Sequence, residues 1–457
     1  MLSSIDYSFI AVYFLIILAA GLWTGRKQDK EGYLIADRKL KSLEATSTIF
    51  SSRIGAAILL TYTALVYMYG LGAYWYFIGS VFGLFIFYFF GKKVKKLGDS
   101  ENFYTFSDFF FHSKGKLAGY LSAVVVIIIM FGWVVLNFTA GARLVEEYTP
   151  ISYDLSVVII GVIILLYLLA GGFKAVVRTD VIQTIGIFLL LILMVFLLVT
   201  TDVKPEITVA QFFGIPTMEI VNFFLAGFFI PMASPELWQR VYAIENQKHF
   251  RRSIFLSSIF YIVIGFILLM IGLVIRTDIP LLNPDTALIV GFSKLLPAGL
   301  AGLSVVIIYS AISSSADTYM FTSASSVTQD FLERLGHLKK ERLRFTMRLI
   351  LFVLMALGIV MALVLRDIVD TTFFFVSLTM SLGFLVLVLW IYPNLNRNSV
   401  NLSMLFCLVG VSIPAVFIGI STDLVKYAIG LCIAGLLIGL VYYKFRKARE
   451  VRVRSGK

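Results

Sequence analysis

Residues Ile308–Phe331 read IYSAISSSADTYMFTSASSVTQDF, a run of Ser and Thr hydroxyls with a carboxylate inside an otherwise apolar segment. At helical spacing, small and hydroxyl-bearing residues collect on one face of this segment. They are Ala311, Ser314, Ser315, Thr318, Thr322, Ser325 and Ser326. Polar groups in a bilayer cost free energy unless they are satisfied, and hard cations such as sodium take oxygen ligands. The stripe therefore predicts a cation site on a membrane helix or, through its small residues, a close helix contact.

The composition of the whole chain is that of a membrane protein. Its 457 residues are 59% hydrophobic and 14% charged, with a mean hydropathy of +0.92. A helix needs roughly 20 apolar residues to cross a bilayer, and the chain offers about thirteen such runs. Their approximate limits are 7–25, 45–69, 72–91, 117–143, 153–172, 179–200, 217–238, 253–275, 287–330, 346–365, 369–392, 400–421 and 424–443. We expect one polytopic all-α domain over residues 1–457, in which the long ninth run begins with a surface segment before its true span at 300–329.

Basic residues are distributed unevenly between alternate loops. If the N-terminus lies outside, most of the 39 Lys and Arg residues fall in cytoplasmic loops, as the positive-inside rule requires. The loop 239–252, with Arg240, counts among them. We therefore expect a multi-pass protein of the plasma (inner) membrane with its N-terminus outside and its C-terminus in the cytoplasm. The net charge of +12 then reflects these loops, so we expect lipid contact at the basic tail Lys444–Lys457 and no nucleic-acid partner.

The predicted spans form two blocks of opposite polarity. Spans two to six start from the cytoplasm and spans seven to eleven start from outside, which is typical of an inverted-repeat transporter. We expect repeats at approximately 45–200 and 217–392, with extra helices at 7–25, 400–421 and 424–443. The first helix of each repeat is broken in such folds. Residues that weaken a helix stand in both candidates, at Ser51–Gly55 in one and at Gly227, Pro231 and Pro235 in the other.

Several short motifs resemble the sodium:solute symporter family, and in particular its bacterial proline-type members. In chain order they are EGYLIADRKL (31–40), AGARLVE (140–146), GGFKAVVRTDVIQ (171–183), SPELWQRVYA (234–243) and AISSSADT (311–318). The resemblance implies a five-plus-five inverted-repeat (LeuT-like) core. It also implies that the chain is not an enzyme but a secondary active transporter, which takes up a small organic solute, such as an amino acid or a carboxylate, together with Na⁺ by alternating access.

The resemblance also implies a sodium site at the junction of the second and ninth spans. Backbone carbonyls at the break of the second span match Ser51 and Ile54. Two adjacent hydroxyls of the ninth span match Ser314 and Ser315, with the carbonyl of Ala311 one turn earlier. Hydroxyls and carbonyls together make a neutral oxygen cage, which suits sodium.

Some family members have a second sodium site, and its aspartate matches Asp180, with Asp317 and Thr318 close to it. Two structural alternatives stay open. Asp180 would otherwise be a carboxylate at the cytoplasmic edge that pairs with Arg178 or Lys174. Asp317 would otherwise belong to an inward-facing ion pair that holds helices together.

Arg53 departs from the family pattern, because most members carry an uncharged or acidic residue there. An arginine at this depth needs a partner or water. It forms a structural bridge with Asp317 or Asp180, or it weakens the sodium site and leaves a proton-coupled or uncoupled transporter, or it binds a carboxylate of the solute.

The solute cavity is expected between the two broken helices and spans three, four and eleven. Candidate wall residues, besides Arg53, are Tyr62, Trp75, Asn137, Asn222, Phe224 and Phe374. A membrane-embedded sensor is the alternative from another functional class. A membrane enzyme is disfavoured, because no convergent set of acid–base or metal-binding residues is apparent in the sequence.

Overall fold

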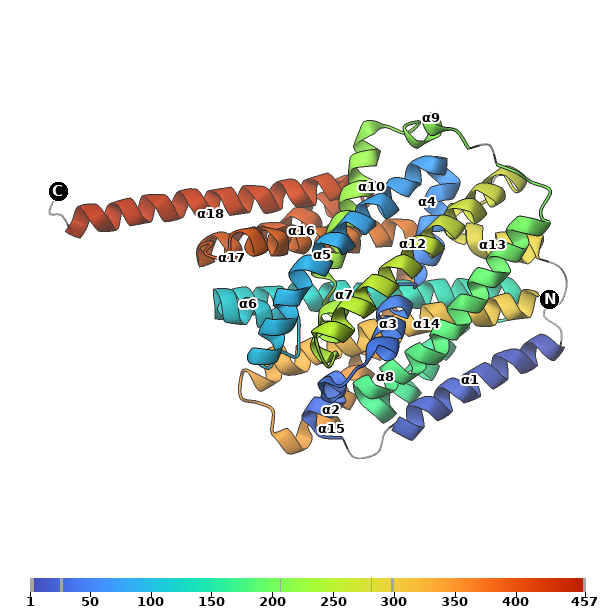
Figure 1. Ribbon diagram of the computed structural model, residues 1–457, viewed down its shortest axis with the longest axis horizontal. Coiled ribbons are helices and arrows are strands. Elements are labelled where there is room, and N and C mark those ends of the chain that lie inside the picture. The colour runs from blue at the N-terminus through green and yellow to red at the C-terminus, as the bar shows by residue number, and fades with distance from the viewer. Residues whose placement is uncertain (1–3, 25–27, 206, 281, 297–299, 455–457) are drawn as a thin grey trace.

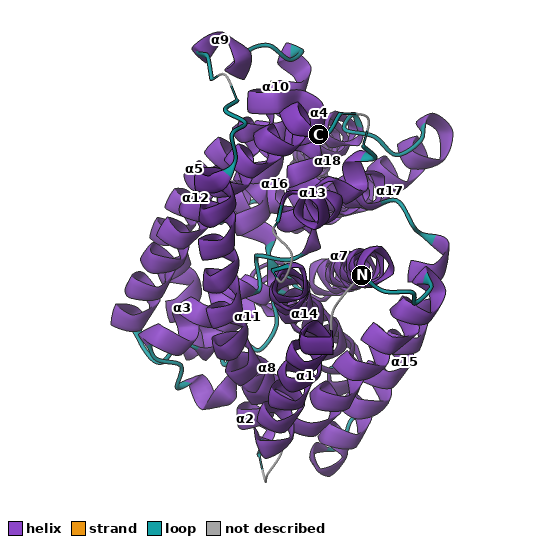
Figure 2. Cartoon of the chain, turned by 90° about the vertical axis from the view of Figure 1, so that its right-hand side faces the viewer, coloured by secondary structure: helices purple, strands orange, loops and turns teal. Residues whose placement is uncertain are grey.

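The computed structural model describes residues 4–24, 28–205, 207–280, 282–296 and 300–454. These residues form helices and connecting loops, with one isolated β-bridge between Leu40 and Ile244 and no strand in the described ranges (Figures 1 and 2). By length and composition, nine of the described helices can cross a membrane. The all-helical prediction is therefore confirmed, whereas the count of about thirteen spans stays a prediction.

The helices run in chain order from the N-terminus as follows. They are α1 (Ser4–Thr24), α2 (Lys30–Ile35), η1 (Ala36–Arg38), α3 (Ser42–Ser51), η2 (Ala57–Thr61), α4 (Tyr62–Tyr69), η3 (Gly70–Tyr74), α5 (Trp75–Ser100), α6 (Ser107–Lys114), α7 (Lys116–Tyr148), α8 (Tyr153–Thr200), α9 (Val209–Phe212), α10 (Thr217–Phe229), η4 (Ile230–Ala233), α11 (Pro235–Ala243), α12 (Gln247–Asp278), η5 (Pro284–Thr286), α13 (Ala287–Leu295), α14 (Ala301–Ser326), η6 (Val327–Glu333), η7 (Lys340–Arg342), α15 (Leu343–Val364), α16 (Ile368–Ile391), α17 (Arg397–Ile418) and α18 (Leu424–Arg454).

Helices α7 and α14 pack against each other in the middle of the bundle, where the other helices surround them (Figures 1 and 2). Helices α17 and α18 pack together at one edge, and α1 lies at the opposite edge against α8 and α14. The polar face of α14 is thus kept away from lipid. The basic tail that was expected at the membrane surface belongs to α18 up to Arg454, and residues 455–457 lie outside the described part of the chain.

Both helices that were expected to break do so. Helix α3 ends at Ser51, and the chain resumes helical structure as a π-helical turn at Ala57, before α4. Asn137 of α7 supports this break, because its Oδ1 accepts the amide of Ala56 at 3.0 Å. In the second broken helix, α10 gives way to the 3₁₀ turn η4, and α11 begins at Pro235 after the extended residue Ser234 (φ −87°, ψ 96°).

The gap between the spans expected at 153–172 and 179–200 predicted a loop at 173–178, and this prediction is wrong. Spans five and six form one helical run, α8, which turns sharply at Gly172 (φ 60°, ψ −154°) and continues directly into the second half. Only glycine adopts this backbone region readily. A Cβ at this position would also lie 2.6 Å from the ring of Tyr33, so the turn needs glycine for two independent reasons.

The long ninth run consists of two helices, as its length suggested. A short α13 precedes α14, and residues 297–299 between them lie outside the described part of the chain. Helix α13 is not a free surface segment, however, because Leu288, Ile289 and Phe292 are buried against neighbouring helices.

Replacing Gly172 by alanine is expected to destabilise the protein by at least about 1–3 kcal/mol, because alanine is strained at this φ and its Cβ meets Tyr33. The measurement is thermal unfolding of the purified protein in detergent. The matched control is Gly430→Ala in α18, where an added Cβ meets nothing within 4 Å. Equal melting temperatures for the two variants would contradict the assigned turn.

Candidate functional site

The stripe on α14 is buried along its whole length, from Ala311 to Ser326. It contacts helices α7 and α8 and also reaches α3 and α11. Its hydroxyls therefore lie where the first helix of each predicted repeat is broken. The stripe is a polar seam inside the bundle and does not face lipid.

A buried ion pair lies at the centre of this seam. One guanidinium nitrogen of Arg240, on α11, is 3.1 Å from a carboxylate oxygen of Asp180, on α8, and both side chains are 0% exposed. The same nitrogen donates to the hydroxyl of Thr318 at 2.6 Å. Arg240 also binds Thr48 of α3, through its carbonyl at 3.0 Å and its hydroxyl at 2.8 Å, and the carbonyl of Glu236 at 3.2 Å. One guanidinium thus joins α3, α8, α11 and α14.

One sequence-based expectation and one of the open alternatives about this charge pair are wrong. Arg240 was counted as a cytoplasmic loop charge, but it is buried because the helix after Pro235 points it back into the bundle. Asp180 pairs with neither Arg178 nor Lys174, and Lys174 instead lies 2.5 Å from Asp37. The motif SPELWQRVYA carries Arg240 and was the signal that could have identified it.

Asp317 lies beside this pair as a second buried carboxylate. Its Oδ2 accepts the hydroxyl of Tyr167 at 2.9 Å, and its Oδ1 has no hydrogen-bond partner among the described residues. The expected ion pair of Asp317 is absent from the described part of the chain. Two fully buried carboxylates therefore lie in the seam, and of the two only Asp180 is paired with a guanidinium among the described residues.

The neighbouring hydroxyls Ser314 and Ser315 point to different helices. Ser314 donates to Oδ1 of Asp180 at 2.6 Å. The hydroxyl of Ser315 lies 3.1 Å from the carbonyl of Ser52 and 3.5 Å from that of Ser51, at the break after α3. Ile54 is buried at the same break, and Ala311 lies one turn before Ser315 on α14. The structure thus brings together the residues matched to the first sodium site.

Arg53 lies in a small central cavity and not in either predicted ion pair. No described ion pair joins it to Asp180 or Asp317, so a structural bridge to them is wrong. The residue is 9% exposed, and its Nε and Nη1 have no hydrogen-bond partner among the described residues. The cavity has a volume of about 40 Å³ and is lined by Arg53, Ala57, Ile58, Tyr76, Met130, Trp133, Ile230, Ala233, Ser234, Glu236, Tyr261, Tyr319 and Thr379.

A second cavity of about 30 Å³ adjoins the first and shares Ala57, Tyr76 and Trp133 with it. Tyr62 lines this second cavity. Of the other proposed wall residues, Asn137 supports the helix break. Like Asn137, the candidates Trp75, Asn222, Phe224 and Phe374 line neither of these two cavities. Trp75 donates to the carbonyl of Phe212 at 2.9 Å instead, because its helix begins there and turns the ring toward α9.

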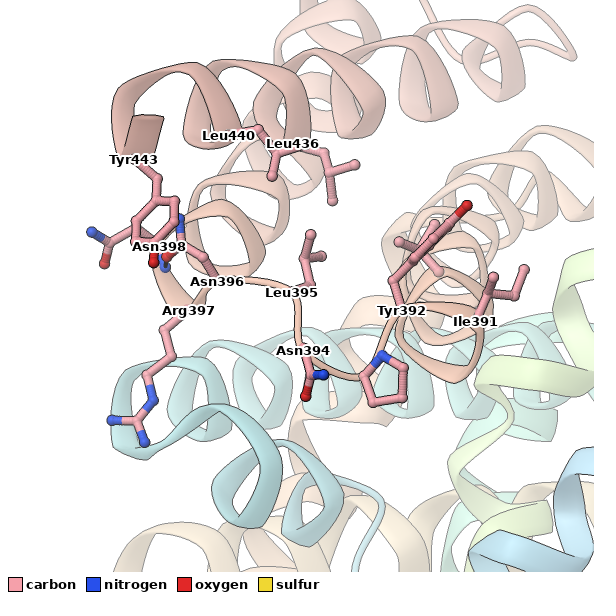
Figure 3. A pocket seen from close by; sticks show the side chains of 12 residues that line it. Ile391, Tyr392, Asn394, Leu395, Asn396, Arg397, Asn398, Leu436, Leu440 and Tyr443 are labelled. Atoms are coloured by element: carbon pink, nitrogen blue, oxygen red, sulfur yellow. Dashed lines mark hydrogen bonds between the residues drawn. The ribbon is translucent and has the colours of Figure 1, made fainter. Parts of the chain in front are cut away.

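A more voluminous groove lies elsewhere, where α16 ends and α17 begins (Figure 3). It measures about 1150 Å³ and includes Tyr392, Arg397 and Tyr443, with Leu436 and Leu440 of α18 on one wall. It shares no residue with the polar seam of α14. Volume alone therefore does not identify the solute site.

Replacing Arg240 by methionine is expected to destabilise the protein by about 3–5 kcal/mol, because Asp180 is left buried without its partner. Adding Asp180→Asn should recover part of that loss, since the uncompensated charge is removed. Thermal unfolding of the single and double variants in detergent measures both effects.

The matched control is Arg366→Met, which breaks the exposed pair between Arg366 and Asp154. This change should cost no more than about 1 kcal/mol. A loss for Arg240→Met as small as that for Arg366→Met would mean that the buried pair does not hold the bundle.

Comparison with known proteins places these features in a family. The model of the sodium:solute symporter family matches residues 33–398. The sodium/pantothenate symporter of Haemophilus influenzae is 25% identical over 354 residues, which cover 70% of this chain and 71% of that protein. The sodium/proline symporter of Staphylococcus aureus (strain Newman) is 24% identical over 357 residues, covering 71% and 68%.

Two solved structures share the fold. A Na⁺-coupled sialic acid symporter in a substrate-bound outward-open state superposes with a TM-score of 0.81 at 16% identity, covering 96% of this chain and 98% of that one. Mhp1, a nucleobase-cation-symport-1 family transporter, gives a TM-score of 0.62 at 13% identity, covering 90% and 94%. The predicted five-plus-five (LeuT-like) fold class is confirmed. With its family model spanning the seam, the broken helices and the ion pair, this chain belongs to the sodium:solute symporter family and is a membrane transporter, not an enzyme.

Proposed function

We propose that this transporter takes up a small organic solute together with sodium. The observation that carries the proposal is the hydroxyl of Ser315, which lies against the carbonyls of Ser51 and Ser52. This contact supports a set of oxygen ligands from α14 at the break of the first helix of the other proposed repeat. Sodium bound there would bridge two elements that must move relative to each other in alternating access.

We assign the coupling ion to the carbonyls of Ser51, Ile54 and Ala311 and to the hydroxyls of Ser314 and Ser315. All five residues are fully buried, and the ligands are neutral oxygens, which suit a hard monovalent cation. The charge of Asp180 lies one hydrogen bond away, through Ser314, and adds long-range attraction.

The second set of residues, Asp180, Asp317 and Thr318, supports a sodium ion less well. The guanidinium of Arg240 already contacts Asp180 and Thr318. A cation there would have to share these oxygens with a positive charge. We therefore favour one sodium ion per cycle, at the first site.

For the solute, we assign Arg53 to a carboxylate. Two of its guanidinium nitrogens, beside the central cavity, have no partner within the described ranges, and a planar guanidinium binds a carboxylate through two parallel hydrogen bonds. The relatives named for proline and pantothenate transport solutes that carry a carboxylate.

The proposed cycle begins outside, with the N-terminus out and the C-terminus in the cytoplasm of a cell limited by its plasma (inner) membrane. Sodium stabilises the outward-open state, and the repeats, approximately 45–200 and 217–392, then rock. Each ligand favours binding of the other because both prefer the same state. Opening toward the cytoplasm requires separation of the Lys30–Glu333 and Arg334–Asp108 pairs.

A second candidate is a transporter of the same fold whose sodium coupling is lost or replaced by protons. The observation that favours it is the position of Arg53, two residues after Ser51 at the break that would supply the sodium carbonyls. A guanidinium here supplies a fixed positive charge beside the carbonyls that we assign to sodium.

The test is thermal stability of the purified protein in sodium against potassium or choline, at equal ionic strength and pH. A bound ion stabilises the folded state by about 1.4 kcal/mol when it is present at ten times its Kd. We expect a sodium-specific rise that disappears in Ser315→Ala. The matched control is Ser323→Ala, which removes another buried hydroxyl of α14 and should keep the rise.

The same measurement separates the two candidates. An equal sodium-specific rise in thermal stability in Ser315→Ala and in the unaltered protein would contradict the assigned sodium site. If the unaltered protein shows no response and Arg53→Ala gains one, the arginine replaces the ion, and the second candidate stands.

A further inference from the structure

The two central cavities differ sharply in character. The first receives a buried cation and a buried anion, Arg53 and Glu236. The second is lined mainly by apolar side chains and by no charged residue; it includes Leu65, Phe223, Ala226, Phe373 and Val376. Two of its hydroxyls, those of Thr61 and Thr372, are hydrogen-bonded to each other at 2.8 Å, and the hydroxyl of Tyr62 has no partner among the described residues. A charged chamber and an apolar chamber therefore meet at Ala57, Tyr76 and Trp133.

Glu236 comes from the second broken helix, in the first turn of α11. Its side chain is 5% exposed, and its Oε2 has no hydrogen-bond partner among the described residues. Leaving a buried carboxylate oxygen unsatisfied is costly, more so than for a neutral group. No described residue supplies a hydrogen-bond donor to this oxygen, so it is open to a donor from a ligand.

Arg53, at the break of the first broken helix, has donors without acceptors in the described part of the structure, which complements the acceptor of Glu236 without a donor. Among the described residues its Nε and Nη1 find no acceptor, and its guanidinium carbon lies 5.1 Å from the ring centroid of Tyr261. No ion pair between Arg53 and Glu236 is recorded in the described part of the chain. Both charges face the same cavity without neutralising each other by contact, so each is open to an opposite charge from a ligand.

We propose that Arg53 binds the carboxylate, and Glu236 the ammonium group, of one zwitterionic solute whose apolar side chain enters the second cavity. The solute class is thus a small apolar α-amino acid. The inference rests on the proposed function, because it names the solute of the same central site. It adds Glu236 and the apolar chamber, neither of which the sodium assignment involves.

The lining of the two cavities also predicts which solutes are excluded. An acid without an amine leaves Glu236 buried and unpaired, and an amine without a carboxylate leaves Arg53 unpaired, so each loses a charged hydrogen-bonded contact. A quaternary ammonium lacks N–H donors for Oε2 of Glu236. A side chain with a charge would have to lose its hydration in the apolar chamber.

The experiment is calorimetric titration of the purified full-length protein, in sodium chloride, with alanine, proline, valine and leucine. For valine, the matched probes are 3-methylbutanoate, which lacks the amine, and isobutylamine, which lacks the carboxylate. Aspartate and lysine test the apolar chamber, and glycine betaine tests the need for N–H donors. We expect binding of at least one apolar amino acid, and at least about tenfold weaker binding of every other probe.

Glu236→Gln is the decisive variant. It should weaken binding of the apolar amino acid at least about tenfold. It should also remove most of the difference in affinity between valine and 3-methylbutanoate, because the neutral amide no longer forms a charged hydrogen bond with the ammonium group. Circular dichroism melting checks that the variant is folded. If it is not, the analogue series on the unaltered protein decides alone. Equal affinity for valine and 3-methylbutanoate would overturn the proposal.

The outcomes separate this inference from the proposed function. Stabilisation by sodium without binding of any apolar amino acid would overturn the zwitterion inference and leave the symporter. Amino-acid binding of equal strength in sodium and in choline would support the zwitterion and overturn sodium coupling. Absence of both responses would overturn both proposals.

Discussion

The guanidinium of Arg240 is the constraint on which the inner architecture depends. A charge that is fully removed from water must be paired and hydrogen-bonded, or the fold does not tolerate it. Arg240 meets this demand with Asp180, Thr318 and Thr48, which come from three other helices. Desolvation offsets much of the attraction, so the pair mainly fixes geometry: the four helices must meet at one point and in one register.

The contact of the four helices around Arg240 also positions the proposed sodium ligands. Ser314 and Ser315 are neighbours on α14, and successive helical residues point about 100° apart. One hydroxyl therefore joins the ion-pair cluster through Asp180, and the next reaches the broken end of α3. The same short stretch of α14 therefore joins the ion-pair cluster and contacts the break after α3. A shift of the ion pair would consequently be transmitted to the carbonyls that we assign to sodium.

Two buried arginines show how structural and ligand-facing charges differ. Arg240 donates to five acceptor atoms of the protein, whereas two nitrogens of Arg53, beside a cavity, have no partner in the described part of the chain. Glu236 resembles Arg53 in this respect, because its Oε2 has no partner among the described residues, whereas its backbone carbonyl accepts a hydrogen bond from Arg240. The satisfied arginine lies within packed helices, and the open charges lie at the helix breaks, where the backbone leaves room for a ligand.

The sequence by itself determined what local composition controls: the membrane class, the apolar runs, the two breakable helices and the hydroxyl stripe of α14. It also carried the motif that holds Arg240 and Glu236. Only the tertiary structure decided which groups meet. Counting basic residues by loop treats Arg240 as solvated, and spacing along the chain predicts a loop where Gly172 turns the helix directly. The partners of a buried charge come from helices distant in sequence, and their contact depends on how whole helices pack.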